Sequence, residues 1–182
     1  MEKIKILGID PSLRNTGLAI IEYDCEKEAF CKPAQCQVVS NPAKFTGTEA
    51  ILNMLDLLKK VSEEEVYSDV TDVVIESPAI MFNKNWSGGA IASISHIAGG
   101  AAVIFGLNRV HLFRPNEWNH CRKKEATHNQ TIAFLGETDS WHYRKALRNE
   151  KLLEHILDAS SLALWYIKNN FIYEADTEKI DA

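Results

Sequence analysis

The sequence lacks paired cysteines, a long uninterrupted apolar run and any secretory signal pattern. Its cysteines, Cys25, Cys31, Cys36 and Cys121, show no C-x-x-C spacing, so we expect free thiols in a reducing cytoplasm rather than a zinc site. The longest apolar stretch, Gly88–Leu107, contains a histidine, two serines and five glycines, which argues against a membrane span. We therefore expect a cytoplasmic protein that does not associate with membranes.

An excess of positive charge is also missing. The formal net charge is −5, which argues against a purely electrostatic nucleic-acid binder but leaves room for a local basic patch. Internal repeats, low-complexity segments and linkers are absent as well. With 182 residues, 46% of them apolar and 25% charged, the chain is predicted to form one globular domain over residues 1–182.

The first strand and its turn organise the rest of the chain. A short β-branched run, Ile4–Ile9, is typical of a strand buried in the middle of a sheet. Asp10 ends this run, Pro11 stops the strand, and a second strand starts at Leu18. A carboxylate at the end of a central strand needs a cation or a hydrogen-bonding turn beside it. From this stretch alone, Asp10 is either a functional acid or a turn cap.

The remaining pattern predicts an α/β domain with a mixed sheet. Three antiparallel strands come first, and helices then alternate with two further strands, which is typical of such layered domains. The third, fourth and fifth strands are expected over residues 36–39, 72–76 and 109–113, and the helices over 47–61, 87–107, 115–118, 125–135 and 149–171, with Asn149 as the N-cap of the last helix.

A second strand repeats the pattern of the first. The segment Asp72–Glu76 is short and apolar, ends in an acid, and is followed closely by Pro78. If this strand pairs in parallel with the first strand, Asp10 and Glu76 are neighbours at one edge of the sheet. The sequence thus predicts two carboxylates side by side.

The last helix adds a histidine and a third carboxylate. Residues Leu152, Leu153, Ile156, Ser160, Ala163, Leu164 and Ile167 share a face that is expected to pack on the sheet. His155 and Asp158 lie three residues apart on a flank, either as a local surface ion pair or as part of a site. Three acids and an imidazole at one point would need divalent cations, and oxygen ligands favour Mg²⁺ or Mn²⁺. Two such ions support phosphodiester cleavage.

Three motifs together resemble the RuvC-type Holliday-junction resolvases of the ribonuclease H-like superfamily. Ile6–Gly17 (ILGIDPSLRNTG) resembles the first motif of that family, and Val74–Glu76 falls at its second strand acid. His155–Ala159 (HILDA) is similar to the closing motif, where Asp or His stands three residues before an Asp that Ala follows. The order and spacing fit over nearly the whole chain.

The resemblance implies a ribonuclease H-like fold, with a five-stranded mixed sheet flanked by α-helices, and a Mg²⁺-dependent crossover junction endodeoxyribonuclease. By that match the metal ligands are Asp10, Glu76, His155 and Asp158, holding two Mg²⁺ ions for which Mn²⁺ can substitute. Lys124 is expected to act in catalysis at the scissile phosphate, with Lys123 as the other candidate for that contact. The residues expected to bind DNA are Phe82, Lys84, Trp86, Arg122, Lys123 and Lys124, although the two aromatic residues could instead pack against the core.

The family resemblance also implies a homodimer, because two symmetric cuts need two sites related by a two-fold axis. The helix over 87–107 is the predicted interface, through Ile91, Ser95, Ala98, Ala102 and Phe105, unless that row packs on the chain's own sheet.

The sequence departs from the family at two positions: Ser12 replaces the common glycine after the first proline, and Asn119 stands where a second basic residue is usual. Three alternatives therefore stay open: a ribonuclease H-like nuclease acting on flaps, forks or other branched DNA; a non-catalytic junction-binding protein; and a nucleotide-binding protein of the actin and sugar-kinase type. A nucleotide-binding protein of that type needs two domains of this kind, whereas the chain is predicted to form one. A non-catalytic junction-binding protein would be expected to lose some of the four metal-site residues, all of which are present.

Overall fold

The computed structural model describes residues 3–78, 88–119, 123–136, 143–144 and 152–172. Its centre is a five-stranded mixed sheet with the order β3-β2-β1-β4-β5. Strands β1 (Lys3–Asp10), β2 (Asn15–Asp24) and β3 (Ala29–Ser40) are antiparallel, whereas β4 (Asp72–Glu76) and β5 (Val110–Phe113) run parallel to β1. The predicted α/β class, the five strands and the parallel pairing of the first and fourth strands are confirmed.

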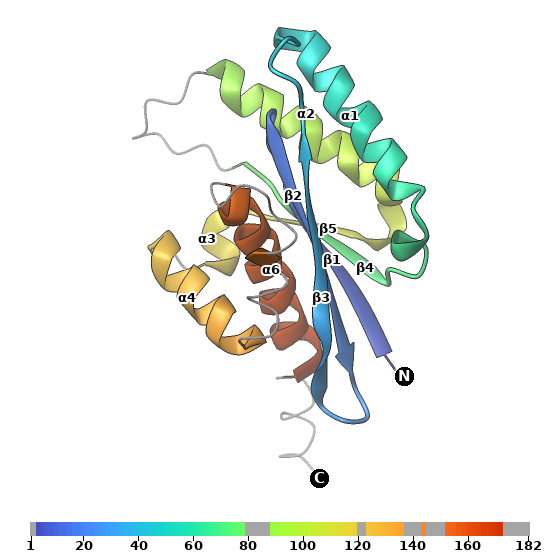
Figure 1. Cartoon of the computed structure of the whole chain (residues 1–182), viewed down its shortest axis with the longest axis vertical. Coiled ribbons are helices and arrows are strands. Elements are labelled where there is room, and N and C mark those ends of the chain that lie inside the picture. The colour runs from blue at the N-terminus through green and yellow to red at the C-terminus, as the bar shows by residue number, and fades with distance from the viewer. Residues whose placement is uncertain (1–2, 79–87, 120–122, 137–142, 145–151, 173–182) are drawn as a thin grey trace.

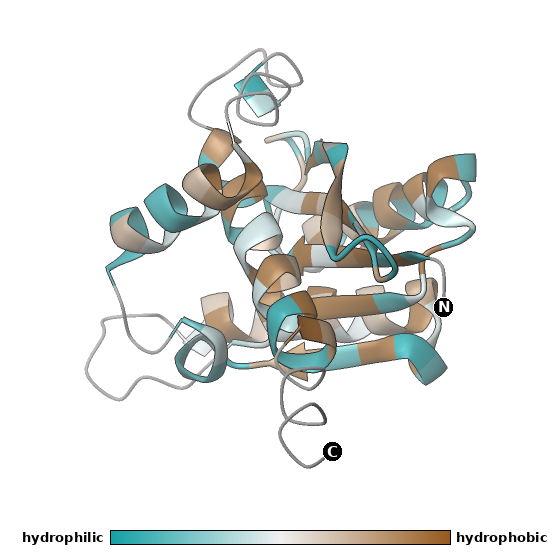
Figure 2. Cartoon of the chain, turned by 90° about the horizontal axis from the view of Figure 1, so that it is seen from below, coloured by the Kyte–Doolittle hydropathy of each residue, from teal (hydrophilic) through white to brown (hydrophobic). Residues whose placement is uncertain are grey.

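Helices cover both faces of the sheet (Figure 1). On one face lie α1 (Gly47–Ser62) and α2 (Gly88–Phe105), and on the other lie α3 (Pro115–Trp118), α4 (Lys124–Leu135) and α6 (Leu153–Ile167). Short 3₁₀ turns, η1 (Glu65–Tyr67) and η2 (Leu107–Arg109), precede β4 and β5, and the π-helical turn η4 (Lys168–Ile172) follows α6. In Figure 2 the strands in the middle of the molecule are coloured mostly as hydrophobic, as expected for a sheet buried between two layers.

The alternation of side chains along the strands decides which layer each residue meets. In β1, Leu7 and Ile9 join the core beneath α1 and α2, whereas Ile4 and Ile6 join the core beneath α6. Asp10 continues the second set, so its carboxylate lies on the α6 face. This parity is the reason that a residue of α6 can reach it.

Two glycines let α6 lie directly on the strands. A Cβ atom at Gly8 would stand 2.0 Å from the carbonyl oxygen of Ala159, and one at Gly17 would stand 2.1 Å from the carbonyl oxygen of His155. No side chain fits at either position, so the helix backbone approaches β1 and β2 more closely than ordinary packing allows. The close approach brings the N-terminal half of α6 against the end of β1.

Two predictions of local structure need correction. The third strand is not confined to residues 36–39 but begins at Ala29, because it pairs with β2 along most of its length through a register shift near Ile20. The helix face on the sheet includes Ala159, which does not belong to the predicted sheet-facing row. Most of α6 is buried because α4 covers its other side, so hydrophobic periodicity could not single out the sheet-facing row. The predicted N-cap Asn149 lies outside the described residues.

Helix α2 packs differently from the predicted interface row. Ala98, Ala102 and Phe105 are buried in this chain's own core, and a Cβ at Gly100 would meet Leu55 of α1. The exposed residues form another row, which we call the α2 stripe: Ala92, Ser95, His96, Gly99 and Val103. By length and composition α2 could span a membrane, but its buried face belongs to the core that α1 and the sheet share.

Candidate active site

The ends of β1 and β4 place two carboxylates side by side. The parallel register pairs Gly8 with Val74 and Ile9 with Ile75, and the next residue on each strand is an acid, Asp10 and Glu76 respectively. By the alternation of side chains along the strands, both acids lie on the face of the sheet that α6 covers. The predicted pair of neighbouring carboxylates at one edge of the sheet is therefore present.

The turn after β1 is closed without the Asp10 side chain. The buried Thr16 hydroxyl donates to the carbonyl oxygen of Ser12 at 2.9 Å and accepts from the Ser12 amide at 3.2 Å. Both bonds use the backbone of Ser12, and its hydroxyl accepts a further, long hydrogen bond from the Arg14 amide at 3.4 Å. Because the turn has its own hydrogen bonds, the alternative of Asp10 as a turn cap is not the one observed.

Helix α6 supplies a partner for Asp10. The Nδ1 atom of His155 lies 2.8 Å from Oδ2 of Asp10, and the two side chains keep 28% and 16% of their surface exposed. Since an ionised carboxylate can only accept, Nδ1 carries the proton in this contact. His155 therefore contacts the end of β1 rather than Asp158, and the alternative of a local surface ion pair is wrong.

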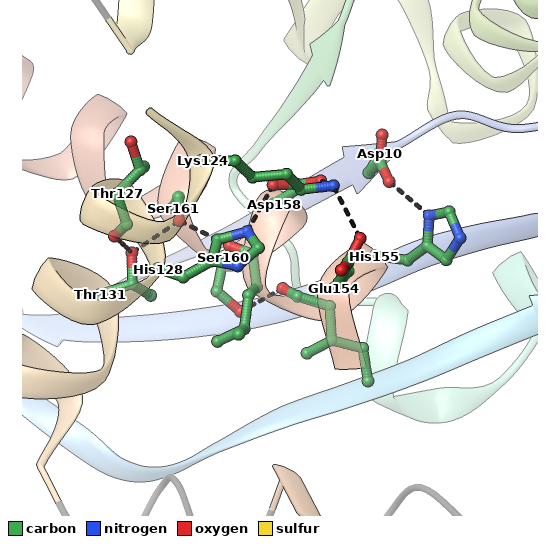
Figure 3. Close-up of polar contacts among 12 residues, drawn as sticks. Asp10, Lys124, Thr127, His128, Thr131, Glu154, His155, Asp158, Ser160 and Ser161 are labelled. Carbon is green, nitrogen blue, oxygen red and sulfur yellow. Dashed lines mark hydrogen bonds and ion pairs between the residues drawn. The ribbon is translucent and has the colours of Figure 1, made fainter. Parts of the chain in front are cut away.

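Two side chains of helix α4 contact the carboxylate of Asp158 (Figure 3). Oδ1 of Asp158 lies 2.7 Å from Nε2 of His128, and Oδ2 lies 2.7 Å from Nζ of Lys124. Lys124 also lies 3.3 Å from Glu154. Lys124 and His128 are four residues apart on α4, which places them on the same helix face.

Glu76 lies in a strongly unfavourable environment for a carboxylate. Burial, followed by the negative charges of Asp10 and Asp158, raises the pKa of Glu76 to about 8, although a 3.1 Å hydrogen bond from the Trp118 indole opposes the shift. Burial also raises the pKa of Asp10, and its contact with His155 only partly offsets this effect. The three acids are therefore electrostatically coupled at one place.

The cationic side chains respond in the opposite sense. The hydrogen bond to Asp10 raises the pKa of His155 against the opposing effect of burial. For Lys124, desolvation lowers the pKa, but the contacts with Asp158 and Glu154 outweigh it and raise the pKa overall. Positive charge is thus favoured among these carboxylates.

The donor set fits a hard divalent cation. Carboxylate oxygens from Asp10, Glu76 and Asp158, with one imidazole nitrogen, are the ligands that Mg²⁺ and Mn²⁺ accept. Among the described residues, no three acidic, histidine or cysteine side chains already converge as a closed metal cage: Asp10 pairs with His155, and Asp158 with Lys124 and His128. Burial, with the negative charges of Asp10 and Asp158 added to it, raises the pKa of Glu76 and so disfavours its ionised form, and a bound cation would relieve this effect.

The predicted DNA-contacting residues fall into two groups. Lys123 is the N-cap of α4 and Lys124 its first residue; both are exposed, and Lys124 reaches Asp158. Arg122 and the segment containing Phe82, Lys84 and Trp86 lie outside the described residues. Among the described residues, Cys25, Cys31 and Cys36 form no disulfide, and Cys121 lies outside those residues.

Sequence reasoning missed two residues of the site. Trp118 is buried and donates to Glu76, and His128 binds Asp158. The spacing of His128 four residues after Lys124 was a usable signal, since it puts both on one face of α4. Nothing in the local sequence linked Trp118 to Glu76, because that contact arises where α3 packs on α6 and the end of β4.

Comparison with known proteins gives structural but not sequence matches. No protein-family model matches the chain, and no curated protein is significantly similar to it in sequence. Thermus thermophilus RuvC in complex with a Holliday junction substrate is similar in structure, with a TM-score of 0.65, 16% identity, and 96% of this chain and 97% of that chain covered. A further Thermus thermophilus RuvC structure has a TM-score of 0.64, 17% identity, and coverage of 92% and 98%. The fowlpox virus resolvase, in complex with Holliday junction DNA, has a TM-score of 0.52, 16% identity, and coverage of 91% and 98%. The chain therefore has the fold of the RuvC-like Holliday-junction resolvases.

Proposed function

We propose that this protein is a structure-selective endodeoxyribonuclease that resolves four-way DNA junctions by paired, divalent-metal-dependent hydrolysis of phosphodiester bonds. The observation that supports this most is the meeting of Asp10 and Glu76 on adjacent parallel strands with His155 and Asp158 from α6. These four residues stand in a fold shared with two resolvases whose structures contain Holliday junction DNA.

Asp10, Glu76, His155 and Asp158 would hold Mg²⁺, with two ions per site and Mn²⁺ able to substitute. Bound divalent ions lower the pKa of a water nucleophile and stabilise the departing oxygen of the phosphodiester. The protein orients the carboxylates for this task by packing: Gly8 and Gly17 admit the backbone of α6, and Trp118 fixes one oxygen of Glu76.

The basic start of α4 would meet the DNA backbone. Lys124 contacts Asp158 and is our candidate for the contact with the scissile phosphate, whereas Lys123, one residue earlier, would contact a neighbouring phosphate. Arg122 and Lys84, which lie outside the described residues, are further proposed contacts to the DNA. Phe82 and Trp86 would stack on bases splayed at the junction centre, a contact of roughly 1–3 kcal/mol per base.

The proposed function is tested by the choice of substrate. With Mg²⁺, the purified protein should nick a labelled four-way junction at symmetric positions, and it should cleave flap, fork and linear duplex DNA at least about tenfold more slowly. EDTA should stop cleavage and added Mn²⁺ should restore it, because the carboxylates need the ion. Preferential cleavage of flaps or forks would instead support another branched-DNA nuclease, and binding without cleavage in Mg²⁺ or Mn²⁺ would support a non-catalytic junction-binding protein.

We further propose a homodimer that uses the α2 stripe rather than the buried row of α2. Val103 is 66% exposed, and a Cβ at Gly99 would meet nothing within 4 Å, so a second chain could approach this helix closely. Leu107, just beyond α2, is 69% exposed and would extend the apolar surface. Two copies related by a two-fold axis would supply the two active sites that symmetric cutting needs.

Sedimentation should show a particle of about 41 kDa, twice the 20.5 kDa of one chain. Val103→Glu should shift the protein towards monomer, because it buries an unpaired charge in the interface. Ala133→Glu is the matched control: Ala133 is exposed on α4, on the opposite face of the sheet, and the variant should remain dimeric. A wild-type protein that stays monomeric at micromolar concentration, with and without junction DNA, would contradict the dimer. The buried Ala98 is unsuitable for this test because a charge there would disrupt the core.

A further inference from the structure

Both carboxylate oxygens of Asp158 are occupied, by partners of different character. His128 holds Oδ1 at 2.7 Å and keeps only 12% of its side chain exposed, whereas Lys124 holds Oδ2 at 2.7 Å and is 51% exposed. Lys124 also pairs with Glu154 at 3.3 Å, so it keeps one ion pair when it releases Asp158. Oδ2 is therefore the oxygen that can be released, and Oδ1 is the one that stays fixed.

We infer that His128 is a positioning residue of the metal centre: by binding Oδ1 of Asp158, it fixes the carboxylate so that Oδ2 faces the ion. This inference rests on the proposed function, since it concerns the ion that Asp158 would ligate. A histidine N–H that holds a ligating carboxylate stiffens the ligand and sets its orientation. Oδ2, the oxygen that Lys124 contacts, is then the one left to face the ion once Lys124 withdraws.

The competing explanation is that His128 merely joins two helices. The next contact along the same seam supplies the control, because the hydroxyls of Thr131 and Ser161 are 2.6 Å apart and buried between α4 and α6 (Figure 3). This pair lies three residues further along each helix and does not contact Asp158. Loss of either contact weakens the seam, but only loss of His128 releases the carboxylate.

The experiment measures Mn²⁺ affinity by calorimetry on the full, DNA-free protein. His128→Leu removes the donor, and we expect Mn²⁺ binding to weaken on the order of 10- to 100-fold. His128→Gln should recover most of this loss, because its carboxamide N–H can still donate to Oδ1. Thr131→Val, which removes only the hydroxyl contact, should bind Mn²⁺ within about twofold of the wild type. Thermal unfolding of each variant checks that it is folded.

The outcomes separate the inference from the proposed function. If the wild type binds Mn²⁺ and His128→Leu binds it equally well, or Thr131→Val loses as much affinity as His128→Leu, the positioning role is refuted while the nuclease proposal stands. A wild type that binds no Mn²⁺ refutes both. Should His128→Leu not fold, His128→Asn replaces it. Because the asparagine side chain is shorter than that of glutamine, the His128→Asn protein should bind Mn²⁺ more weakly than the His128→Gln protein. Equal Mn²⁺ affinities of these two variants would refute the inference.

Discussion

Asp10→Asn should abolish junction cleavage while leaving junction binding intact. The substitution removes one anionic ligand from the proposed metal site with almost no change in volume, so a loss of about 4 kcal/mol in transition-state stabilisation, roughly 1,000-fold in rate, is expected. Glu76→Gln and Asp158→Asn should behave alike. Binding should be equal or slightly tighter, because a negative charge facing the DNA phosphates is removed. Single-turnover cleavage and a binding titration measure the two effects separately.

Asp72 provides the matched control for these variants. It lies on β4 with Glu76 and follows the same parity of side chains, but at the opposite end of the strand, where it pairs with His111 at 2.9 Å. Asp72→Asn should therefore keep cleavage within about threefold of the wild type. The assignment of the acids at the ends of β1 and β4 would be contradicted if Asp10→Asn cleaved at the wild-type rate. It would also be contradicted if Asp72→Asn lost as much cleavage activity as Asp10→Asn.

Loss of activity in these variants should not come from loss of stability. Glu76 has a folded-state pKa of about 8, above its ordinary value of 4.5, so without metal its ionisation opposes folding as pH rises from about 4.5 to 8. Glu76→Gln should remove this penalty, and at pH 8 without metal its unfolding temperature should equal or exceed that of the wild type. A lower unfolding temperature at that pH would mean that the carboxylate is needed for the fold itself.

The double variant Lys123→Ala/Lys124→Ala should show the second large effect, on DNA affinity. Two phosphate contacts contribute a salt dependence of about 0.9 each to the logarithmic slope, so their loss should flatten the slope by up to about 1.8 and weaken binding by up to about 60-fold at 0.1 M salt. The effect should be similar across DNA sequences, since phosphate contacts carry no sequence information. Fluorescence titrations at several salt concentrations give both values.

The structure also separates the two lysines. Both lysines are exposed, but Lys124 must exchange its contacts with Asp158 and Glu154 for a phosphate, so Lys123→Ala should account for the larger share of the lost affinity. Lys59→Ala/Lys60→Ala, a pair of exposed lysines on α1 across the sheet, is the control and should leave the slope unchanged. If the α4 double variant keeps both affinity and slope, the basic cluster is only a solvated surface.

The sequence by itself determined the framework of this protein. The apolar runs that end in Asp10 and Glu76, with a proline soon after each, predicted both strands and both acids, because a buried strand and its interruption are local properties of the chain. The class of fold and the count of five strands followed from the same patterning, as the sheet confirms. The family resemblance of the three motifs also led to the fold that the structural comparisons support.

Only the tertiary structure decided which partners these side chains meet. His155 and Asp158 are neighbours on one helix, yet one binds Asp10 and the other binds His128. That division follows from the backbone contact of α6 at Gly8 and from the docking of α4 on the other side, neither of which helical periodicity encodes. The same holds for α2, where the row buried in the chain's own core could not be distinguished from the exposed row. An apolar helix surface specifies that it will be buried, but the packing of the other elements decides which surface covers it.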